Sequence, residues 1–370
     1  MIPPKGATTE ATMDWVSSQK KNIHSEKKRS LADFYVSVLG VGTYLGSYDE
    51  VTDKLYEDTI ELALLSGVNL IDSAINYRCQ RSEKLIGRVL KKLQDQKKIS
   101  RDEIVVCTKG GFIPFDLVPP ESLPGHIKKN WLNTGIVSEE DIVSSCHCLH
   151  PRFLQGMIDQ SLANLGLDTI DIYYLHNPET QLSGAQPDVF YSRLYEAFCL
   201  LEENVSKGKI QFYGLATWTA FRTEGNESIS LKTILDLALK AGGESHHLKV
   251  IQLPYNLAML EAVGIHNQEY KGELYPILSA ASFYGIDVVI SAPLLQGQLG
   301  HLPQPLMHKL PGSLMAPGRA LQFVTSTPGV AAALVGMKTK AHWEQNKIVL
   351  TEANWDLKVL EEVCRYLIKG

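Results

Sequence analysis

The stretch Val68–Glu83 reads VNLIDSAINYRCQRSE and decides the fold of this chain. It opens with an apolar run that predicts a buried strand, and Asp72 follows where that run stops. Tyr77 lies further along, in the polar loop that leaves the strand, and Ser82 is expected to cap a helix over Glu83–Leu93. An acid at a strand end and a phenol in the next loop are candidate site residues. Asp also caps turns, so a purely structural role is the alternative at this point.

Length and composition exclude several classes of protein. A chain of 370 residues can hold two domains or one large α/β barrel, and a hydrophobic content of 44% supports a sizeable core. A net charge of −5 argues against nucleic acid or an anionic membrane as the main partner. No apolar run approaches the ~18–20 residues that span a bilayer, and the start MIPPKGATTEATMDW lacks the apolar part of a secretory signal. Six cysteines in so long a chain indicate no disulfide scaffold, so a cytoplasmic location is expected.

Outward from the opening stretch, short apolar segments alternate with helical or loop segments along the chain. The predicted strands are Val36–Thr43, Val68–Ile71, Ile104–Thr108, Ile170–Leu175, Gln211–Ala216, Val250–Leu253, Asp287–Ser291 and Val330–Val335. Continuously apolar strands indicate burial on both faces, as in a parallel sheet covered by helices. Eight such units favour an α/β fold made of a single (β/α)8 TIM barrel over an open doubly wound sheet. A helix is also predicted over Glu273–Tyr284.

No linker divides the chain, so we predict a polar N-terminal extension of residues 1–30, ending in a short hairpin, and one barrel domain of residues 31–370. The glycines of Gly40-x-Gly42-x-x-x-Gly46 are spaced one residue too far for a dinucleotide fingerprint, and no helix opens directly after them.

A long insertion, Phe112–His150, follows the third strand and is rich in proline and aromatic residues. Connections of this length in a compact domain are usually functional, so the insertion is expected to shape the substrate pocket. It ends in Cys146-His147-Cys148-Leu149-His150, four potential metal ligands at a spacing that does not match known zinc sites. No metal site is therefore predicted.

Polar residues stand at the ends of neighbouring predicted strands. Asp72 follows the second strand, Lys109 the third and His176 the fourth, with Tyr77 in the loop after the second. The C-terminal ends of barrel strands meet at one face, so these side chains can converge there. Each has a bland alternative, a solvated lysine or a packed histidine, but four in register by chance are less expected than any one alone.

Several motifs resemble those of the aldo-keto reductase superfamily, and they extend from about Val36 to Asn346. They are IDSAINYRCQRSEKLIG (71–87), VVCTKGG (105–111), IYYLHNPE (172–179), QLPYNL (252–257), APLLQGQLG (292–300) and VGMKTKAHWEQN (335–346). The resemblance implies a (β/α)8 barrel that binds NADP(H) or NAD(H) across its mouth and reduces an aldehyde or ketone to an alcohol. It also implies a catalytic tetrad at Asp72, Tyr77, Lys109 and His176.

The chemistry of these four residues supports the same interpretation. Hydride delivery to a carbonyl carbon leaves charge on the oxygen, which must receive a proton. Tyr77 is expected to give that proton, with Lys109 lowering its pKa and Asp72 holding Lys109 charged. His176 is expected to hydrogen-bond the substrate carbonyl.

The resemblance implies a set of cofactor contacts, of which Lys338 and Lys340 suit a phosphate and Gln345 and Asn346 suit adenine. The full set is Gly42, Thr43, Thr217, Gln252, Ser291, Pro293, Leu294, Gln296, Gly336, Lys338, Lys340, His342, Gln345 and Asn346. NADP(H) is expected to be preferred, with NAD(H) possible. The chain departs from the superfamily at Ala216-Thr217, in place of a Ser-Asn pair, at Ser291, in place of an aromatic ring, and at His342, in place of an arginine.

Aromatic residues near the strand ends are the candidate substrate pocket: Tyr44, Phe112, Trp131 and Trp218. The expected partner is a small carbonyl or alcohol, with no nucleic acid and no membrane, and the sequence leaves the oligomeric state open. An alternative is a barrel subunit that senses a nicotinamide cofactor with little turnover, which a broken tetrad would favour. A metal-dependent barrel hydrolase needs more ligands than Asp72 and His176 supply.

Overall fold

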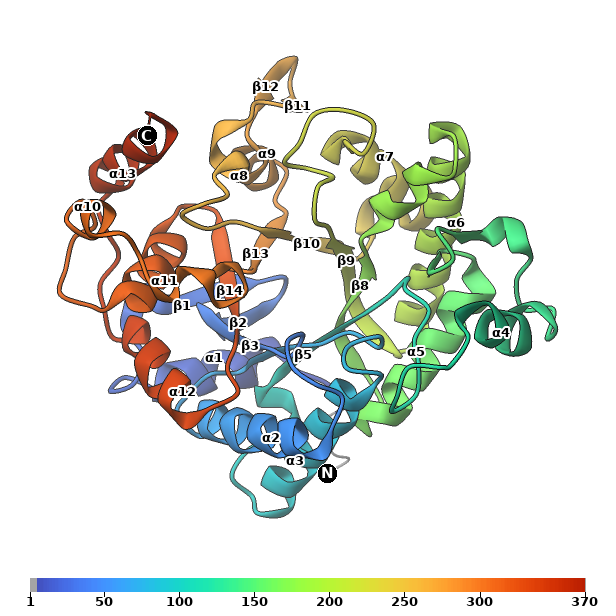
Figure 1. Cartoon of the computed structure of the whole chain (residues 1–370), viewed down its shortest axis with the longest axis horizontal. Helices are drawn as coiled ribbons and strands as arrows, with labels where there is room; N and C mark the ends of the chain where they lie inside the picture. Colours follow the sequence, from blue (N-terminus) through green and yellow to red (C-terminus); the bar gives the residue numbers. More distant parts are fainter. Residues whose placement is uncertain (1–4, 370) are drawn as a thin grey trace.

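Eight parallel strands close into a barrel in the computed structural model, which describes residues 5–369 (Figure 1). The strands are β3 (Leu39–Gly42), β4 (Leu70–Asp72), β5 (Val105–Gly110), β8 (Ile170–His176), β9 (Ile210–Ala216), β10 (Leu248–Pro254), β13 (Asp287–Ser291) and β14 (Val330–Gly336). Each pairs with the next in chain order, and β14 pairs with β3 to close the ring. The predicted (β/α)8 barrel is confirmed.

The strands are mostly apolar because both of their faces are buried. Leu70 and Val105 point into the barrel and pack in its interior. Their neighbours Ile71 and Val106 point outward and pack beneath the helices. Successive side chains of a strand point to opposite faces, so a continuous apolar run fills both the barrel and the layer around it.

Helices surround the barrel in Figure 1. They are α2 (Glu50–Leu65), α3 (Arg81–Asp95), α5 (Pro151–Leu165), α6 (Pro187–Ser206), α7 (Leu231–Gly242), α9 (Ile277–Phe283), α11 (Ala316–Ser326), α12 (Lys340–Asn346) and α13 (Leu357–Lys369), with short turns α8 (Glu261–Gly264) and α10 (Gln304–Met307). No helix among the described residues is both long and apolar enough to span a bilayer.

Helix α3 begins earlier than expected. Its predicted apolar face is buried, but Ser82 is not its cap. The capping position is Gln80, in a left-handed conformation with φ of 65°, and the Ser82 hydroxyl instead donates to the carbonyl oxygen of Thr43 at 2.8 Å. The loop after Tyr77 enters the helix through left-handed residues, so the first turn starts at Arg81.

The N-terminal residues close the bottom of the barrel. After α1 (Thr9–Ser18), β1 (Lys28–Leu31) and β2 (Phe34–Ser37) form an antiparallel hairpin, and Leu31 and Phe34 pack with the side chains of the barrel interior. The single strand predicted over Val36–Thr43 is therefore wrong: its first residues belong to this hairpin and only β3 belongs to the barrel. The division into an extension of residues 1–30 and a domain of residues 31–370 stays a prediction, and residues 1–4 and 370 lie outside the described residues.

The helix predicted over Glu273–Tyr284 is also wrong at its start. Glu273–Tyr275 is β12, which pairs with β11 (Gln268–Tyr270) across a turn at Lys271 and Gly272. Both turn residues have positive φ, 52° and 87°, the geometry of a two-residue hairpin turn. The helix begins only at Ile277.

The insertion between β5 and α5 lies against the strand ends. It contains α4 (Leu123–Ile127), a π-helical turn over Lys128–Leu132, and a small hairpin of β6 (Ile142–Val143) and β7 (His147–Cys148). Its first residue, Phe112, forms a bridge with His147, so the end of the insertion returns to the end of β5.

Candidate active site

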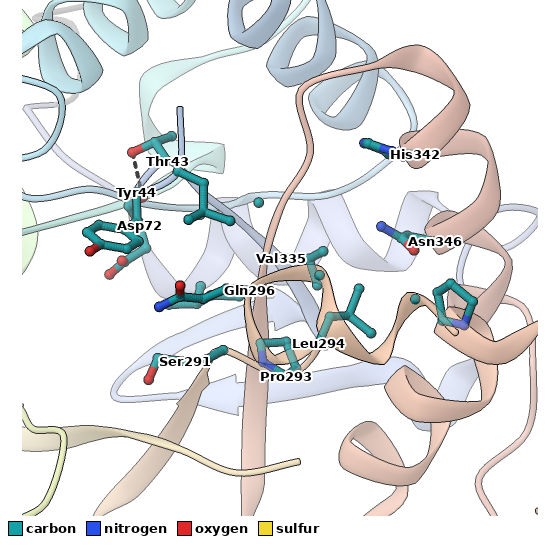
Figure 2. A pocket seen from close by; sticks show the side chains of 18 of the residues that line it. Thr43, Tyr44, Asp72, Ser291, Pro293, Leu294, Gln296, Val335, His342 and Asn346 are labelled. Atoms are coloured by element: carbon teal, nitrogen blue, oxygen red, sulfur yellow. Dashed lines mark hydrogen bonds between the residues drawn. The ribbon is translucent and has the colours of Figure 1, made fainter. Parts of the chain in front are cut away.

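The four residues of the predicted tetrad meet at the C-terminal face of the barrel. Asp72, Tyr77 and His176 line a cavity of about 1190 Å³, and Lys109 lies directly behind Asp72. Figure 2 shows Asp72 beside Thr43 and Tyr44, facing the residues that follow β13. Two strand ends and one loop supply these three side chains, in line with the expected convergence of strand ends at one face.

A buried ion pair forms the floor of the site. Lys109 Nζ donates to Asp72 Oδ1 and, at 2.7 Å, to the carbonyl oxygen of Ser73. Gln252 Nε2 donates to Asp72 Oδ2 at 3.0 Å, so both carboxylate oxygens are used. Burial raises the pKa of Asp72, and Lys109 opposes the rise. Burial also acts to lower the pKa of Lys109, but Asp72 and neighbouring groups outweigh it and this pKa is raised.

Tyr77 stands over this pair. Lys109 Nζ lies 5.0 Å from the centre of the Tyr77 ring, and the rings of Tyr44 and His176 lie edge-on to it at 5.0 and 5.5 Å. Burial raises the pKa of Tyr77, with Lys109 pulling the other way. Lys109 thus acts on the Tyr77 pKa in the expected direction, but removal of the phenol from water has the larger effect, so the pKa is raised overall.

Three left-handed residues hold the Tyr77 loop. Arg78, Cys79 and Gln80 have φ of 49°, 55° and 65°, conformations that cost about 1–2 kcal/mol each for residues with a Cβ. Arg78 Nε donates to the carbonyl oxygen of Ser47 at 2.8 Å, and Gln80 Nε2 to that of Phe115 at 3.0 Å. Contacts to two other loops thus stabilise a backbone that the local sequence does not favour.

His176 is neutral and faces the cavity. Burial lowers its pKa well below the ordinary value, with Lys109 adding to the effect. Phe112 packs edge-on against its ring at 5.0 Å. Within residues 5–369 neither ring nitrogen has a hydrogen-bond partner, and Nδ1 is fully buried. A neutral imidazole still carries one N–H, which can donate to a ligand.

Most of the predicted cofactor contacts line the same cavity. They are Gly42, Thr43, Thr217, Gln252, Ser291, Pro293, Leu294, Gln296, Gly336, Lys338, His342, Gln345 and Asn346. In Figure 2, Thr43 and Ser291 lie on one side of the view and His342 and Asn346 on the other, with Gln296, Pro293 and Leu294 between them. Lys340 is the exception: it is exposed at the start of α12 and lies outside the lining.

The residues present fit a nicotinamide dinucleotide. The lining offers hydroxyls at Thr43 and Ser291, amides at Gln252, Gln345 and Asn346, and the ammonium group of Lys338. A Cβ at Gly46 would lie 3.3 Å from Lys338 Cδ, so the glycine leaves room beside the lysine side chain. Positive φ at Gly46, 119°, favours glycine there for a second reason.

Three of the four predicted pocket aromatics line the cavity: Tyr44, Phe112 and Trp218. Trp131 does not; it packs against Phe153 with ring centres 4.9 Å apart, in the core beside α5. Of the insertion, only Phe112 reaches the cavity. The expectation that the insertion forms a pocket wall is therefore reduced to its first residue.

Sequence reasoning missed other lining residues. Asn76 and Asn177 lie beside Tyr77 and His176 in the motifs, and their polarity could have drawn attention to them. Several others come from the segment after β13 and from the first turn of α11: His301, Leu302, Gln304, Met307, Met315, Ala316 and Pro317. Nothing local marks that segment as part of a site, because it follows a loop rather than ending a strand.

The Cys146–His150 cluster is not arranged around a metal. Within residues 5–369 no group of three or more His, Cys, Asp or Glu side chains is placed to hold a metal ion. His147 instead bonds to a backbone oxygen and to an amide side chain.

A comparison with known protein families adds to this geometry. The model of the aldo/keto reductase family matches residues 38–301. The chain belongs to the aldo/keto reductase family. The match covers the barrel from β3 through the loop after β13, and with it each member of the tetrad.

The similarity to individual aldo/keto reductases is lower and covers only part of the chain. The chain is 30% identical over 189 residues to the NADH-specific methylglyoxal reductase of Escherichia coli K12, covering 50% of this chain and 49% of that protein. It is 24% identical over 216 residues to the aldo-keto reductase YhdN of Bacillus subtilis, covering 58% and 47%. The chain thus spans about half the length of the curated relatives it matches.

Solved aldo/keto reductases share the fold. The chain resembles the holo form of aldo-keto reductase AKR11C1 from Bacillus halodurans with a TM-score of 0.63 and 20% identity, over 92% of this chain and 95% of that one. It resembles an aldo/keto reductase of Klebsiella pneumoniae in complex with NADP and acetate with a TM-score of 0.61 and 19% identity, over the same shares.

Proposed function

We propose that this aldo/keto reductase reversibly reduces a small aldehyde or ketone to an alcohol. The observation that carries the proposal is the buried Asp72–Lys109 ion pair placed directly beneath the Tyr77 ring, with His176 beside it at the cavity. When bound, a nicotinamide cofactor supplies the hydride in reduction and accepts it in oxidation. The chain's own residues orient the carbonyl and handle the proton.

Tyr77 is the proton donor in this scheme. The substrate oxygen accepts hydrogen bonds from the Tyr77 hydroxyl and from the N–H of His176. As the carbonyl becomes an alkoxide, Tyr77 passes its proton to that oxygen. Tyr77 is left as a phenolate, which Lys109 stabilises. Oxidation runs the same proton in reverse, with the phenolate as general base.

A panel of aldehydes and ketones with NADPH or NADH, together with the corresponding alcohols and NADP⁺ or NAD⁺ in the oxidative direction, tests the function. Cofactor oxidation that depends on the carbonyl supports it. A protein that binds the cofactor but turns over no member of the panel would instead be a cofactor-sensing barrel. The intact ion pair beneath Tyr77 favours the enzyme, because a sensor has no need of it.

We propose that NADP(H) is preferred by a modest margin. The E. coli relative is NADH-specific and the Klebsiella structure holds NADP, so relatives do not decide the matter. Lys338 is the one lysine or arginine among the described lining residues. A single lysine offers one charge-assisted contact to a 2′-phosphate, where an arginine at position 342 would add a bidentate one.

His342→Arg is therefore expected to raise the preference for NADPH over NADH by about tenfold to a hundredfold, from a contact of about 1.5–3 kcal/mol. Lys338→Met is the matched opposite change. It is expected to weaken NADPH binding while leaving NADH binding nearly unchanged. The ratio of kcat/KM for the two cofactors measures both. A Lys338→Met protein with an unaltered ratio contradicts the assignment of this lysine.

Ser291 stands where other superfamily members are expected to place an aromatic ring against the nicotinamide. Ser291→Tyr is expected to tighten cofactor binding, since aromatic stacking contributes about 0.5–1.5 kcal/mol beyond buried area. Fluorescence titration of the cofactor measures the change. Unchanged affinity in a folded variant would show that another ring, such as Trp218 in the same lining, already occupies that place.

A further inference from the structure

His147 contacts the strand that carries His176 although it lies outside the cavity lining. It is fully buried on β7, near the end of the insertion. Its Nε2 lies 2.7 Å from the carbonyl oxygen of His176, and its Nδ1 lies 2.9 Å from Nε2 of Gln181. The Gln181 amide nitrogen can only donate, so Nδ1 accepts. The ring hydrogen is then on Nε2, which donates to His176.

The orientation of Gln181 is fixed from its other side. Arg193 donates one N–H to Gln181 Oε1 at 2.7 Å and another to the carbonyl oxygen of Glu140 at 2.6 Å. A guanidinium is never an acceptor, so the amide oxygen must face it and the amide nitrogen must face His147. The donors therefore run in one direction, from Arg193 through Gln181 and His147 to the end of β8.

Packing holds the two histidines in the same relation. The Phe112 ring stands edge-on to both, with ring centres 5.0 Å from His147 and 5.0 Å from His176. A Cβ at Gly111 would lie 2.8 Å from His147 Nε2 and 2.9 Å from the His176 oxygen. A glycine at this position, with φ of 143°, thus allows the imidazole to reach the strand end.

Protonation does not disturb this arrangement at ordinary pH. Burial lowers the pKa of His147 to about 4, so the ring keeps its acceptor at Nδ1. A charged ring would turn that acceptor into a second donor facing the amide N–H of Gln181.

We propose that His147 is a positioning residue for His176, and that the insertion supports the carbonyl-binding histidine from outside the barrel. Its hydrogen bond fixes the backbone of His176, and Phe112 transmits its position to the His176 ring. The role in reduction rests on the proposed function; the contact with His176 does not. The long insertion then acts on the reaction in two ways: through the hydrogen bond from His147 to His176, and through the Phe112 ring at the cavity.

The test compares two substitutions at His147. His147→Leu removes the donor and leaves the His176 carbonyl unpaired, whereas His147→Gln keeps an N–H at the same reach. We expect His147→Leu to lower kcat for a carbonyl substrate by about 10- to 100-fold, the cost of a small misplacement of a catalytic group, with cofactor affinity unchanged. His147→Gln is expected to recover most of that loss.

His126→Leu is the matched control. His126 lies in the same insertion, bonds to the carbonyl oxygen of Pro114 at 3.2 Å and packs edge-on against Phe115. It is outside the cavity lining, and its ring contacts neither His147 nor His176. It is expected to keep full kcat. Arg193→Met, at a half-buried site, is a milder second variant in case His147→Leu does not fold. It is expected to lower kcat by several-fold.

The NMR signals of the His176 imidazole in ¹⁵N-labelled protein give a readout independent of turnover. They are expected to shift in His147→Leu, to return toward wild type in His147→Gln and to stay in place in His126→Leu. Full kcat and unshifted His176 signals in folded His147→Leu overturn the positioning role. A wild type with no turnover on any carbonyl overturns the proposed function, while the His176 signals still decide the contact.

Discussion

Tyr77→Phe is expected to lower turnover by about 10²–10⁴-fold, the contribution of a placed proton donor. The substitution removes the hydroxyl that faces the cavity and leaves the ring on which Tyr44 and His176 pack. Cofactor affinity should change little, because the hydroxyl is not required to hold the cofactor. Steady-state kinetics with a carbonyl substrate and a cofactor titration separate the two effects. Near-normal turnover in a folded Tyr77→Phe protein would remove Tyr77 from the mechanism.

The pH dependence of the wild type gives a second measure of the same group. Burial raises the pKa of Tyr77, so the phenol keeps its proton through the neutral range. Reduction, which needs the phenol, is expected to hold its rate from neutral pH upward until the phenol begins to ionise. Oxidation, which needs the phenolate, is expected to rise over the same range. The Tyr77→Phe protein should show neither the fall in the reduction rate nor the rise in the oxidation rate.

Lys109→Met is expected to abolish activity and to lower the free energy of unfolding by about 3–5 kcal/mol, the cost of stranding a buried charge. Lys109 and Asp72 have side chains only 1% and 5% exposed, so water cannot replace the lost partner. Turnover and chemical denaturation measure the two losses. An unchanged free energy of unfolding in Lys109→Met would contradict the expected cost of leaving Asp72 without its partner.

The matched control is the double variant Asp72→Asn/Lys109→Met, which removes both charges. Its stability is expected to recover while its activity stays lost, because no ammonium remains to stabilise the Tyr77 phenolate. The pH dependence of Lys109→Met has a defined sign. Burial raises the pKa of Asp72, and without Lys109 that rise is larger, so the folded state binds a proton more tightly than the unfolded state. The variant should be most stable at low pH and lose stability as pH rises through the folded pKa of Asp72.

The local sequence was sufficient to place three of the four predicted tetrad residues. A strand buried on both faces must be apolar along its whole length, so the position where the apolar run stops marks the strand end. Asp72, Lys109 and His176 stand at such ends, and parallel strands bring their ends to one face. The barrel follows from the same pattern repeated along the chain.

Contacts between distant segments decided what the pattern could not. The first residues of the apolar run Val36–Thr43 belong to the hairpin β1–β2, which packs against the barrel interior at its open bottom. Trp131 lies outside the predicted pocket because its ring packs in the core beside α5. Hydrophobic spacing reports that a side chain is buried, but not which of two apolar surfaces buries it.

The sequence by itself therefore determined the barrel and the identity of the residues at its strand ends, because both follow from the local alternation of apolar and polar residues. Only the tertiary structure decided the electrostatics and support of the site. The upward shift of the Tyr77 pKa, the bond from Gln252 to Asp72 and the bond from His147 to His176 each depend on groups far apart in the chain. Such terms arise from burial and from the geometry of through-space contacts, which are set only when the chain has folded.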